Sequence, residues 1–324
     1  MTQGAGLRRT LAALTAVWVI SSAGGCESDD ASPPSSPAES APASGDTDGP
    51  PEALRRFKDE ATLGDLLELL AMPHQLARSG SLGPHTISYR AHFELLPQAP
   101  DDHPPKVGEA IHTSFDVDDE LELRWDLPAD GVPRAWLRQQ NSREDRRELI
   151  LLDGQAYTRL HEDQWYQREL DGDLHETWFA EAYASVHDFV EFAAPQLTLE
   201  RVDELDGGPS GKQLEVHLSL GKGRDEALGR DGAPSRWRAT SRIDAASGWV
   251  RIDAESGVWL AAEMNLAWRM TDAAQRPLVG KSSINASLAP GPVQIELPAG
   301  AVPMPERMRY TVERNKLLDG LAAP

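Results

Sequence analysis

The feature that most constrains the fold of this chain is a two-residue alternation of apolar and polar side chains. The segment HTISYRAHFEL places Ile87, Tyr89, Ala91, Phe93 and Leu95 on one side. Successive side chains of a β-strand point to opposite faces of the sheet, so this pattern is typical of a strand with one buried face. Antiparallel sheets commonly have one buried and one solvated face, and the alternation therefore predicts an antiparallel sheet.

The same alternation returns through most of the chain after this segment. It is seen in AIHTSFDV, ELELRWDL, RELILLDGQAYTRL, QWYQREL, LTLERVDEL, KQLEVHLSL, SRWRATSRID, GWVRID, VWLAAEMNLAWRM and VGKSSINASLA. Asp153-Gly154 is a two-residue hairpin signal between two of these runs. RIDAASGWV at 242–250 and RIDAESGVW at 251–259 match each other, and we interpret them as successive hairpin corners, since the glycine pattern of a calcium-binding β-roll is missing. The simplest topology is a meander.

Helical spacing replaces the alternation in two places. The segment from residue 51 to residue 80 repeats leucines at helical intervals, with Thr62 as a cap for its second half, Pro73 as a break and Gly80 past its end. DLHETWFAEAYASVHDFVEFAAPQL carries a broad apolar stripe that Pro195 ends. A short helix is also predicted over residues 304–321. Together with the strands, these segments predict an α+β fold that is mainly antiparallel β, a curved sheet or unclosed barrel with helices packed on its concave face.

The second helical segment is unusually aromatic, and two interpretations stay open. One is a helix that simply packs on the sheet. The other is a lid across a concave sheet face that shelters an apolar ligand, because aromatic side chains are crowded into fifteen positions. The candidate ligand-binding residues of this lid are Trp178, Phe179, Tyr183, Val186, Phe189 and Phe192.

Cys26 is the only cysteine of the 324 residues, which excludes an intramolecular disulfide, a zinc ribbon and a CxxC redox pair. Arg8 and Arg9 precede an apolar run at 11–20, and small residues fill positions 21–25. A charged region, a short apolar region and a small-residue cleavage site predict a secretory signal peptide over residues 1–25, and the apolar run is too short to span a bilayer.

The residues before the cysteine resemble the lipobox of bacterial lipoproteins. Ala23, Gly24 and Gly25 supply the small residues that precede the modified cysteine, although the family usually has Leu where this chain has Ala23. The resemblance implies that Cys26 is acylated and anchors the chain in the bacterial cell envelope, on the periplasmic face or surface of a membrane, with the outer membrane favoured. The alternative is an ordinary signal peptide followed by a free thiol.

Residues 26–52 predict a disordered tether between the anchor and a globular domain. From Glu27 to Pro51 the chain contains no apolar residue larger than alanine, so it buries too little surface to offset its chain entropy. The remaining residues, 53–324, are expected to form one β-rich domain with covering helices.

The charge balance limits the classes of molecule that the chain can bind. The chain has 32 Lys and Arg against 52 Asp and Glu, a net charge of -20. Such an acidic surface repels nucleic acid and anionic head groups, so we expect no nucleic-acid partner and a membrane contact through the acyl anchor.

Motifs for catalysis are sparse. DGGPSGK at 206–212 has the wrong spacing for a phosphate loop and precedes a strand, so we interpret it as a loop. The nine histidines are scattered singly, without HExxH or HxxxH pairs, and no GxSxG elbow occurs. We therefore expect no catalytic residues, no metal ligands and no cofactor, and a protein that is not an enzyme. A carboxylate-dependent hydrolase remains a third hypothesis.

The order of elements resembles the LolA/LppX/LprG group of bacterial periplasmic lipid and lipoprotein carriers. The likeness lies in the opening helix, the strand SYRAHFEL, the LLDGQAYTRL…WYQREL hairpin, the aromatic helix and the later meander. It implies an unclosed antiparallel barrel whose helix-covered cavity holds acyl chains. The leading hypothesis is therefore a lipid or lipoprotein carrier without enzymatic activity. The alternative is an envelope structural or interaction lipoprotein with a filled core and a protein partner.

Overall fold

The structure, a computed structural model, describes residues 51–98, 114–128, 132–160, 164–169, 172–222, 241–271 and 276–305, and for residues 172–178 the backbone alone. The predicted signal peptide, Cys26, nearly all of the predicted tether and most of the predicted C-terminal helix lie outside these residues.

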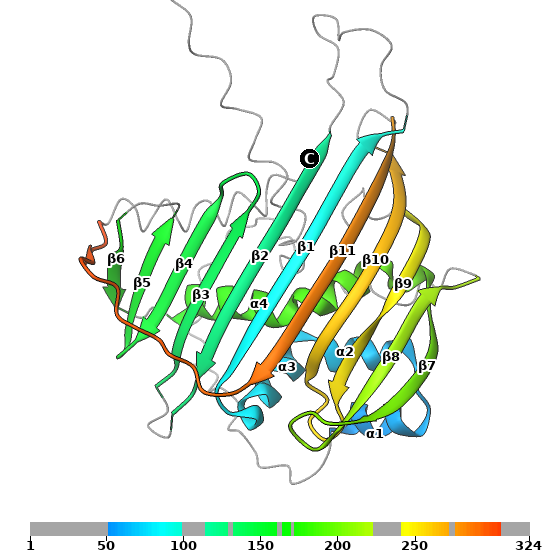
Figure 1. The fold of residues 1–324 in the computed structure, drawn as a ribbon, viewed down its shortest axis with the longest axis horizontal. Coiled ribbons are helices and arrows are strands. Elements are labelled where there is room, and N and C mark those ends of the chain that lie inside the picture. Colours follow the sequence, from blue (N-terminus) through cyan, green and yellow to red (C-terminus); the bar gives the residue numbers. More distant parts are fainter. Residues whose placement is uncertain are drawn as a thin grey trace, which may run out of the picture.

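One mainly antiparallel sheet dominates the described part of the chain (Figure 1). Its strands follow the order β12-β6-β5-β4-β3-β2-β1-β11-β10-β9-β8-β7. Their bounds are β1 His85–Pro97, β2 Phe115–Asp126, β3 Arg134–Asn141, β4 Arg146–Leu152, β5 Gln155–Leu160, β6 Tyr166–Glu169, β7 Leu197–Asp206, β8 Lys212–Leu220, β9 Arg242–Asp253, β10 Trp259–Thr271, β11 Pro277–Pro290 and β12 Val302–Pro303. The sheet does not close, because its two edge strands, β12 and β7, lie at opposite ends of the order. This confirms the predicted fold class.

Two meanders, β1 to β6 and β7 to β11, make up this sheet. They join where β1 pairs with β11 along the whole length of β1, from His85 opposite Pro290 to Pro97 opposite Leu278. The predicted hairpin at Asp153-Gly154 is confirmed, since both residues have positive φ, 52° and 73°, as a type I′ turn requires. DGGPSGK connects β7 to β8, as expected of a loop.

Helices cover one face of the sheet, here named the inner face; the other is the outer face. Their bounds are α1 Glu52–Asp59, α2 Leu63–Leu70, α3 Met72–Ser79 and α4 Gly172–Ala193. Figure 1 shows α4 running across several strands, with α1 and α2 behind the β7–β10 side. In the part of the chain that the structure describes, no helix is both long and apolar enough to cross a membrane.

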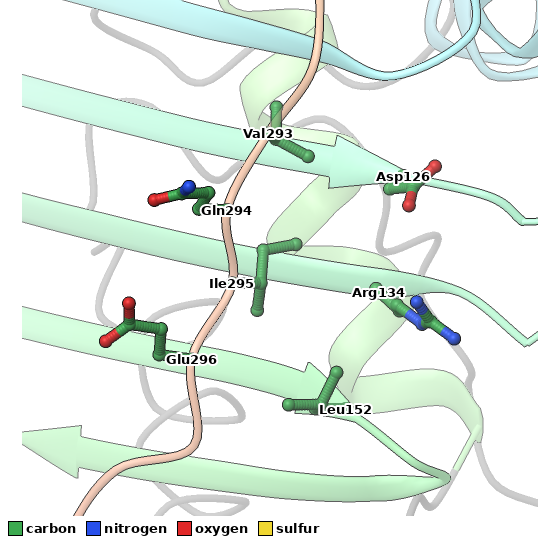
Figure 2. A pocket seen from close by; sticks show the side chains of 7 residues that line it. All are labelled: Asp126, Arg134, Leu152, Val293, Gln294, Ile295 and Glu296. Atoms are coloured by element: carbon green, nitrogen blue, oxygen red, sulfur yellow. The ribbon is translucent and has the colours of Figure 1, made fainter.

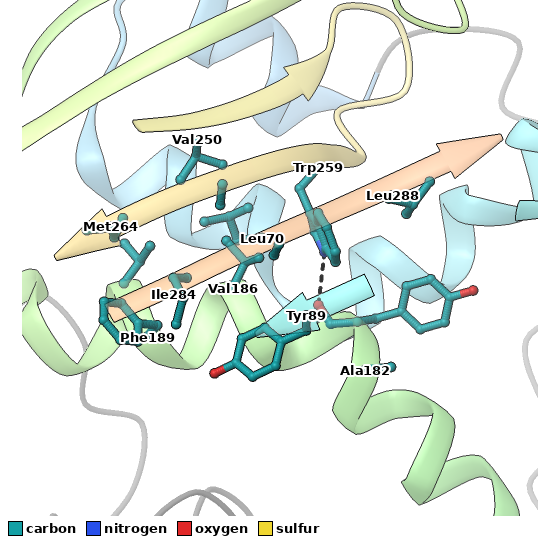
Figure 3. Packing of buried hydrophobic residues seen from close by; sticks show 14 of the residues in the cluster. Leu70, Tyr89, Ala182, Val186, Phe189, Val250, Trp259, Met264, Ile284 and Leu288 are labelled. Carbon is teal, nitrogen blue, oxygen red and sulfur yellow. Dashed lines mark hydrogen bonds between the residues drawn. The ribbon is translucent and has the colours of Figure 1, made fainter. Parts of the chain in front are cut away.

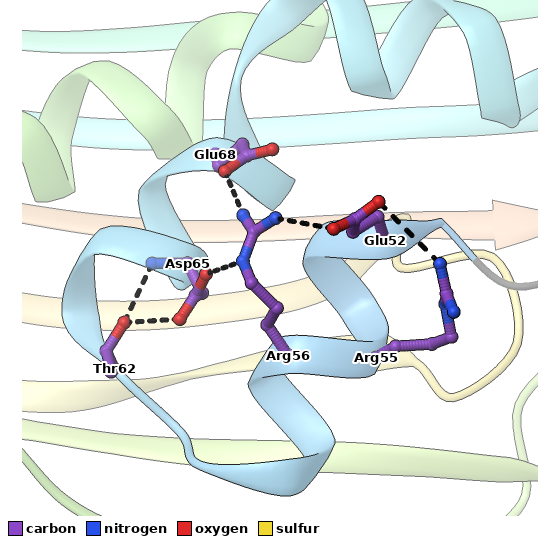
Figure 4. A network of polar contacts seen from close by, with 6 residues as sticks. All are labelled: Glu52, Arg55, Arg56, Thr62, Asp65 and Glu68. Atoms are coloured by element: carbon purple, nitrogen blue, oxygen red, sulfur yellow. Dashed lines mark hydrogen bonds and ion pairs between the residues drawn. The ribbon is translucent and has the colours of Figure 1, made fainter.

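The cap at Thr62 and the break near Pro73, both predicted for the first helical segment, are present in the structure. The Thr62 hydroxyl accepts a hydrogen bond from the Asp65 N–H at 3.1 Å, which caps α2 (Figure 4). Arg56 of α1 bonds to Asp65 at 2.9 Å and also to Glu68, so the two helices are tied together on their exposed side. Ala71 is extended, with ψ of 140°, and α3 begins just before Pro73, so the break is confirmed.

The nonapeptide prediction was wrong for its first copy. RIDAASGWV lies inside β9, whereas RIDAESGVW contains the β9–β10 corner, where the Asp253 carboxylate accepts a hydrogen bond from the Ser256 N–H at 2.9 Å. Gly248 of the first copy does not make a turn. A Cβ on Gly248 would lie 2.2 Å from the carbonyl oxygen of Glu263. The lack of a side chain at this position therefore lets β10 approach β9 closely.

A strap, defined as residues 291–301, leaves β11 and crosses the outer face of the β2–β5 strands before joining β6 as β12 (Figure 2). The Val302 N–H donates to the Trp165 carbonyl at 3.0 Å. Beneath the strap lies a cavity of about 310 Å³. Its lining consists of Asp126, Arg134, Leu152, Val293, Gln294, Ile295 and Glu296.

Candidate functional site

Two aromatic contacts fix the path of α4 over the inner face. The ring of Phe179 meets that of Trp125 edge to face at 5.4 Å, and Phe192 meets Trp268 in the same way at 5.4 Å. Trp125 of β2 pairs with His85 at the start of β1. Trp268 of β10 pairs with Gly280 of β11, which in turn pairs with Leu95 near the end of β1. The helix therefore crosses the sheet diagonally.

Most of the predicted lid residues are core residues. Phe179, Tyr183, Val186 and Phe189 are at most 3% exposed and belong to the main hydrophobic cluster. Figure 3 shows Val186 and Phe189 within it. Phe192 is half-buried against the same cluster. The side chain of Trp178 lies outside the described part of the chain. Ligand binding by this set stays a prediction.

Polar contacts reinforce the packing at the middle of α4. The Trp259 indole N–H donates to the Tyr183 carbonyl at 3.0 Å, and the Tyr183 hydroxyl lies 2.6 Å from Nε2 of His85. Nδ1 of His85 lies 2.7 Å from the Gly83 carbonyl, which only accepts, so Nδ1 carries the proton and Nε2 accepts from Tyr183. Burial lowers the pKa of His85 and raises that of Tyr183. The space beneath this part of α4 is thus occupied by the protein's own side chains.

Beside α4 the inner face carries an apolar corner, defined as Phe93, Phe115, Val117, Phe192 and Met270. Phe93 lies opposite Val117 in the β1–β2 pair. Val117 is buried, but the other four side chains are only partly buried where they pack against the core. Strand alternation places the β1 and β2 members on the same face as α4. The corner therefore presents aromatic surface at the end of an otherwise closely packed face.

A polar relay, defined as Asp119, Gln139, Arg147 and Glu181, borders the apolar corner. Asp119 follows Val117 on the same face of β2 and accepts a hydrogen bond from the Gln139 amide at 2.8 Å. The Gln139 oxygen accepts from Nε of Arg147 at 2.7 Å, and Arg147 also bonds to Glu181 of α4. Burial raises the pKa of Asp119. The relay joins α4 to β2, β3 and β4 and supplies polar groups that can orient a ligand head group.

Two clusters of metal-type donors were missed by the sequence reasoning. His187, Asp188 and Glu191 lie together on α4, and a second group joins β7 to β8. Within the first cluster, the i, i+4 spacing of His187 and Glu191 in HDFVE was readable once the helix was predicted. The second depends on strand register, which the sequence did not provide. It consists of Asp203, Glu215 and His217.

Arginines stack on tryptophans across the outer face. Arg251 lies 4.4 Å from the ring of Trp249, and Arg124 lies 4.5 Å from that of Trp136. Glu148 of β4, one of the strands that the strap crosses, is 3% exposed. Burial works to raise its pKa, yet hydrogen bonds from two arginines hold the pKa of Glu148 below its usual value. The outer face is therefore polar, with aromatic planes between its charges.

Comparison with known proteins identifies no family for this chain. No family model matches the chain, and no curated protein matches it significantly. Among solved structures, MucB in complex with MucA(peri) is 16% identical over 74% of this chain and 60% of that one, with a TM-score of 0.21. MucB alone is 13% identical over 72% and 62%, with a TM-score of 0.23. The Pseudomonas aeruginosa MucA/MucB complex is 13% identical over 71% of this chain and 99% of that one, with a TM-score of 0.15. The chain spans about 60% of the length of the first two, and TM-scores this low identify neither a family nor a function.

Proposed function

We propose that the chain is a lipid-anchored, non-enzymatic binding protein of the bacterial envelope. It takes an apolar ligand, with an acyl chain or lipid as the best-fitting class, against the apolar corner. The observation that carries the proposal is that Phe93, Phe115 and Phe192 are each only partly buried at the end of the inner face where β1 ends. Cys26, at the end of the predicted signal peptide, supplies the anchor.

The chemistry of the corner supports an amphiphilic ligand. Ligand sites are mostly apolar and aromatic, with a few polar groups that fix orientation. Phe93, Phe115 and Phe192 supply the aromatic wall, and the adjoining polar relay supplies a carboxylate and a guanidinium. A ligand at the corner leaves the packing around Tyr183 intact, whereas a ligand beneath the middle of α4 requires that helix to move.

The first experiment is native mass spectrometry of the purified full chain, released gently from its producing host. A mass excess that disappears on denaturation and matches a lipid is the expected result. Fluorescent fatty acid should then bind the wild-type chain, and Phe115→Ser should weaken this binding by about tenfold or more, since burying a phenylalanine contributes about 1.5–3 kcal/mol.

Trp136→Ser, on the outer face, is the matched control and should bind like wild type. The proposal fails if the polypeptide is bare and the fluorescent probe does not bind. It also fails if both variants lose binding equally.

A second function, an interaction lipoprotein with a filled core, is favoured by the outer face. Arg and Trp are enriched among residues that dominate protein interfaces, and Trp249 with Arg251 forms such a pair on a face that no described helix covers. A photo-crosslinking residue at position 249 in intact cells should capture a discrete partner. A crosslinker at Leu76, which is exposed on α3, should not. Absence of any adduct at position 249 would count against this function.

A further inference from the structure

The strap, residues 291–301, encloses a cavity between itself and the outer face. At its start, the Gly291 N–H donates a hydrogen bond to the Pro84 carbonyl at 2.8 Å. At its other end the strap continues into β12, which pairs with β6. Between these two ends, Nη1 of Arg124 donates to the Gln294 carbonyl at 3.5 Å. The strap therefore forms a roof over β2, β3 and β4, and the space of about 310 Å³ beneath it is here named the strap cavity.

One side of the strap cavity is aliphatic. Val293 and Ile295 of the strap and Leu152 at the end of β4 line it, and all three are half-buried. Figure 2 shows Val293 and Ile295 on the side of the strap where Leu152 lies. The side chains of Gln294 and Glu296 are exposed and point to the other side. The aliphatic side chains are therefore the strap side chains that can contact a ligand in the cavity.

Two opposite charges lie on the floor of the strap cavity. Asp126 of β2 and Arg134 of β3 both line it and are directly opposite each other in the β2–β3 pair. Side chains in such a pair have Cβ atoms about 4.5–5.5 Å apart. Within the part of the chain that the structure describes, the Asp126 carboxylate forms no ion pair. A guanidinium has five N–H donors, so Arg134 can bind a carboxylate of a ligand in addition to its contacts within the protein.

We propose that the strap cavity binds a free α-amino acid with an aliphatic side chain. The ammonium group of the ligand donates to Asp126, and its carboxylate accepts from Arg134. Its side chain contacts Leu152, Val293 and Ile295. An α-amino acid carries an ammonium and a carboxylate on one carbon, which matches two opposite charges on neighbouring strands.

The size of the strap cavity supports this class of ligand. Ligand cavities range from about 300 to 1,000 Å³, and this one is near the lower limit, so it fits a small molecule better than a lipid. A simple inorganic ion would leave one of the two charges and the aliphatic side chains without a contact. The site lies on the outer face, whereas the apolar corner lies on the inner face, so the two proposals do not depend on each other.

The test is calorimetric titration of L-leucine into the full chain in a non-ionic detergent, with saturation-transfer NMR as a second readout. Wild type should bind one equivalent of L-leucine. Isoamylamine is leucine without its carboxylate, and isocaproate is leucine without its ammonium group. Each should bind wild type more weakly than L-leucine by about tenfold or more, because each loses a charge-assisted hydrogen bond.

A pair of variants tests the position of the ligand. Asp126→Asn keeps the size of the side chain and removes its charge, and it should weaken L-leucine binding by about tenfold or more. Asp118→Asn is the matched control and should bind like wild type. Asp118 lies on the same face of β2, nearer its other end, and does not line the strap cavity.

Four results would overturn the proposal. They are wild type that binds no L-leucine, an Asp126→Asn chain with wild-type affinity, an equal loss in Asp118→Asn, and isoamylamine or isocaproate that binds as tightly as L-leucine. Thermal unfolding of both variants verifies that weakened binding does not come from unfolding. If Asp126→Asn proves unfolded, the comparison of the three ligands on wild type decides the question.

Discussion

At the scale of single residues, His85 joins three parts of the structure. It begins β1, its Nδ1–H donates to the turn at Gly83, and its Nε2 accepts from Tyr183 of α4. Ser79, at the end of α3, also hydrogen-bonds to the Tyr183 hydroxyl. Because these groups are buried, each depends on the others for hydrogen bonding.

Tyr183→Phe should lower the free energy of unfolding by about 1–3 kcal/mol, because it leaves the buried Nε2 of His85 without its donor. Urea unfolding followed by circular dichroism measures the change. Tyr89→Phe is the control, since its hydroxyl makes no hydrogen bond with the described residues, and it should change stability by less than about 0.5 kcal/mol. Equal losses in the two variants would contradict the role of the His85–Tyr183 bond.

Stability should fall as the pH drops below 6.5. Burial lowers the pKa of His85 and of His74 from 6.5, so the unfolded chain binds protons first and acid favours unfolding. At pH 7.5 and above, both states carry almost entirely neutral imidazoles, so this effect is nearly absent. Urea midpoints at pH 7.5, 6.5 and 5.5 should decrease in that order. His85→Gln should make the decrease shallower; an unchanged pH dependence in that variant would exclude His85 as its source.

At the scale of elements, close packing between β10 and β11 supports the C-terminal end of α4. A Cβ on Gly280 would lie 2.3 Å from the ring of Trp268, the residue that Phe192 of α4 contacts. Position 280 therefore has no room for a side chain, because the ring of Trp268 lies over the backbone of β11 there.

Gly280→Ala should destabilise the protein by about 1–3 kcal/mol, because the ring of Trp268 must move. Gly80→Ala is the matched control: its backbone is right-handed helical, with φ of -57°, and nothing lies within 4 Å of the added Cβ. It should be neutral or stabilise by up to about 1 kcal/mol, through the unfolded state. Thermal unfolding compares the two, and a harmless Gly280→Ala would refute the packing argument.

At the scale of the whole molecule, the predicted anchor and the two proposed binding faces belong to different parts of the chain. The described domain begins at α1, 26 residues after Cys26. If Cys26 is acylated as predicted, a tether of that length and composition would separate the domain from the membrane without fixing its orientation. The apolar corner and the outer face could therefore both reach partners in the envelope.

Cys26→Ser should release the protein from the membrane, because the substitution removes the predicted acylation site. Membrane fractionation of cells that express either chain measures the shift, and metabolic labelling with palmitate should mark wild type alone. A Cys26→Ser chain that stays in the membrane fraction would rule out the lipid anchor.

The candidate site was predictable only in part. The aromatic helix was correctly located, and its end near Pro195 and its packing stripe follow from local spacing, yet four of the six proposed lid residues, Phe179 among them, are in the core. Apolar spacing indicates which side of a helix is buried but not whether protein or ligand covers it. Phe93 and Phe115 were assigned to strand faces correctly, but nothing local indicated that Phe192 of α4 packs against Trp268.

The sequence by itself determined the antiparallel sheet, the helices over 51–80 and around Trp178 to Phe192, the Asp153-Gly154 hairpin and the inward side of β1 and β2, because periodicity and turn chemistry act between near neighbours in the chain. Only the tertiary structure decided that β1 pairs with β11, that α4 crosses diagonally, and that Asp119 meets Gln139 while Asp203 meets Glu215. Those contacts join residues far apart in sequence, and register and packing against the whole core select them.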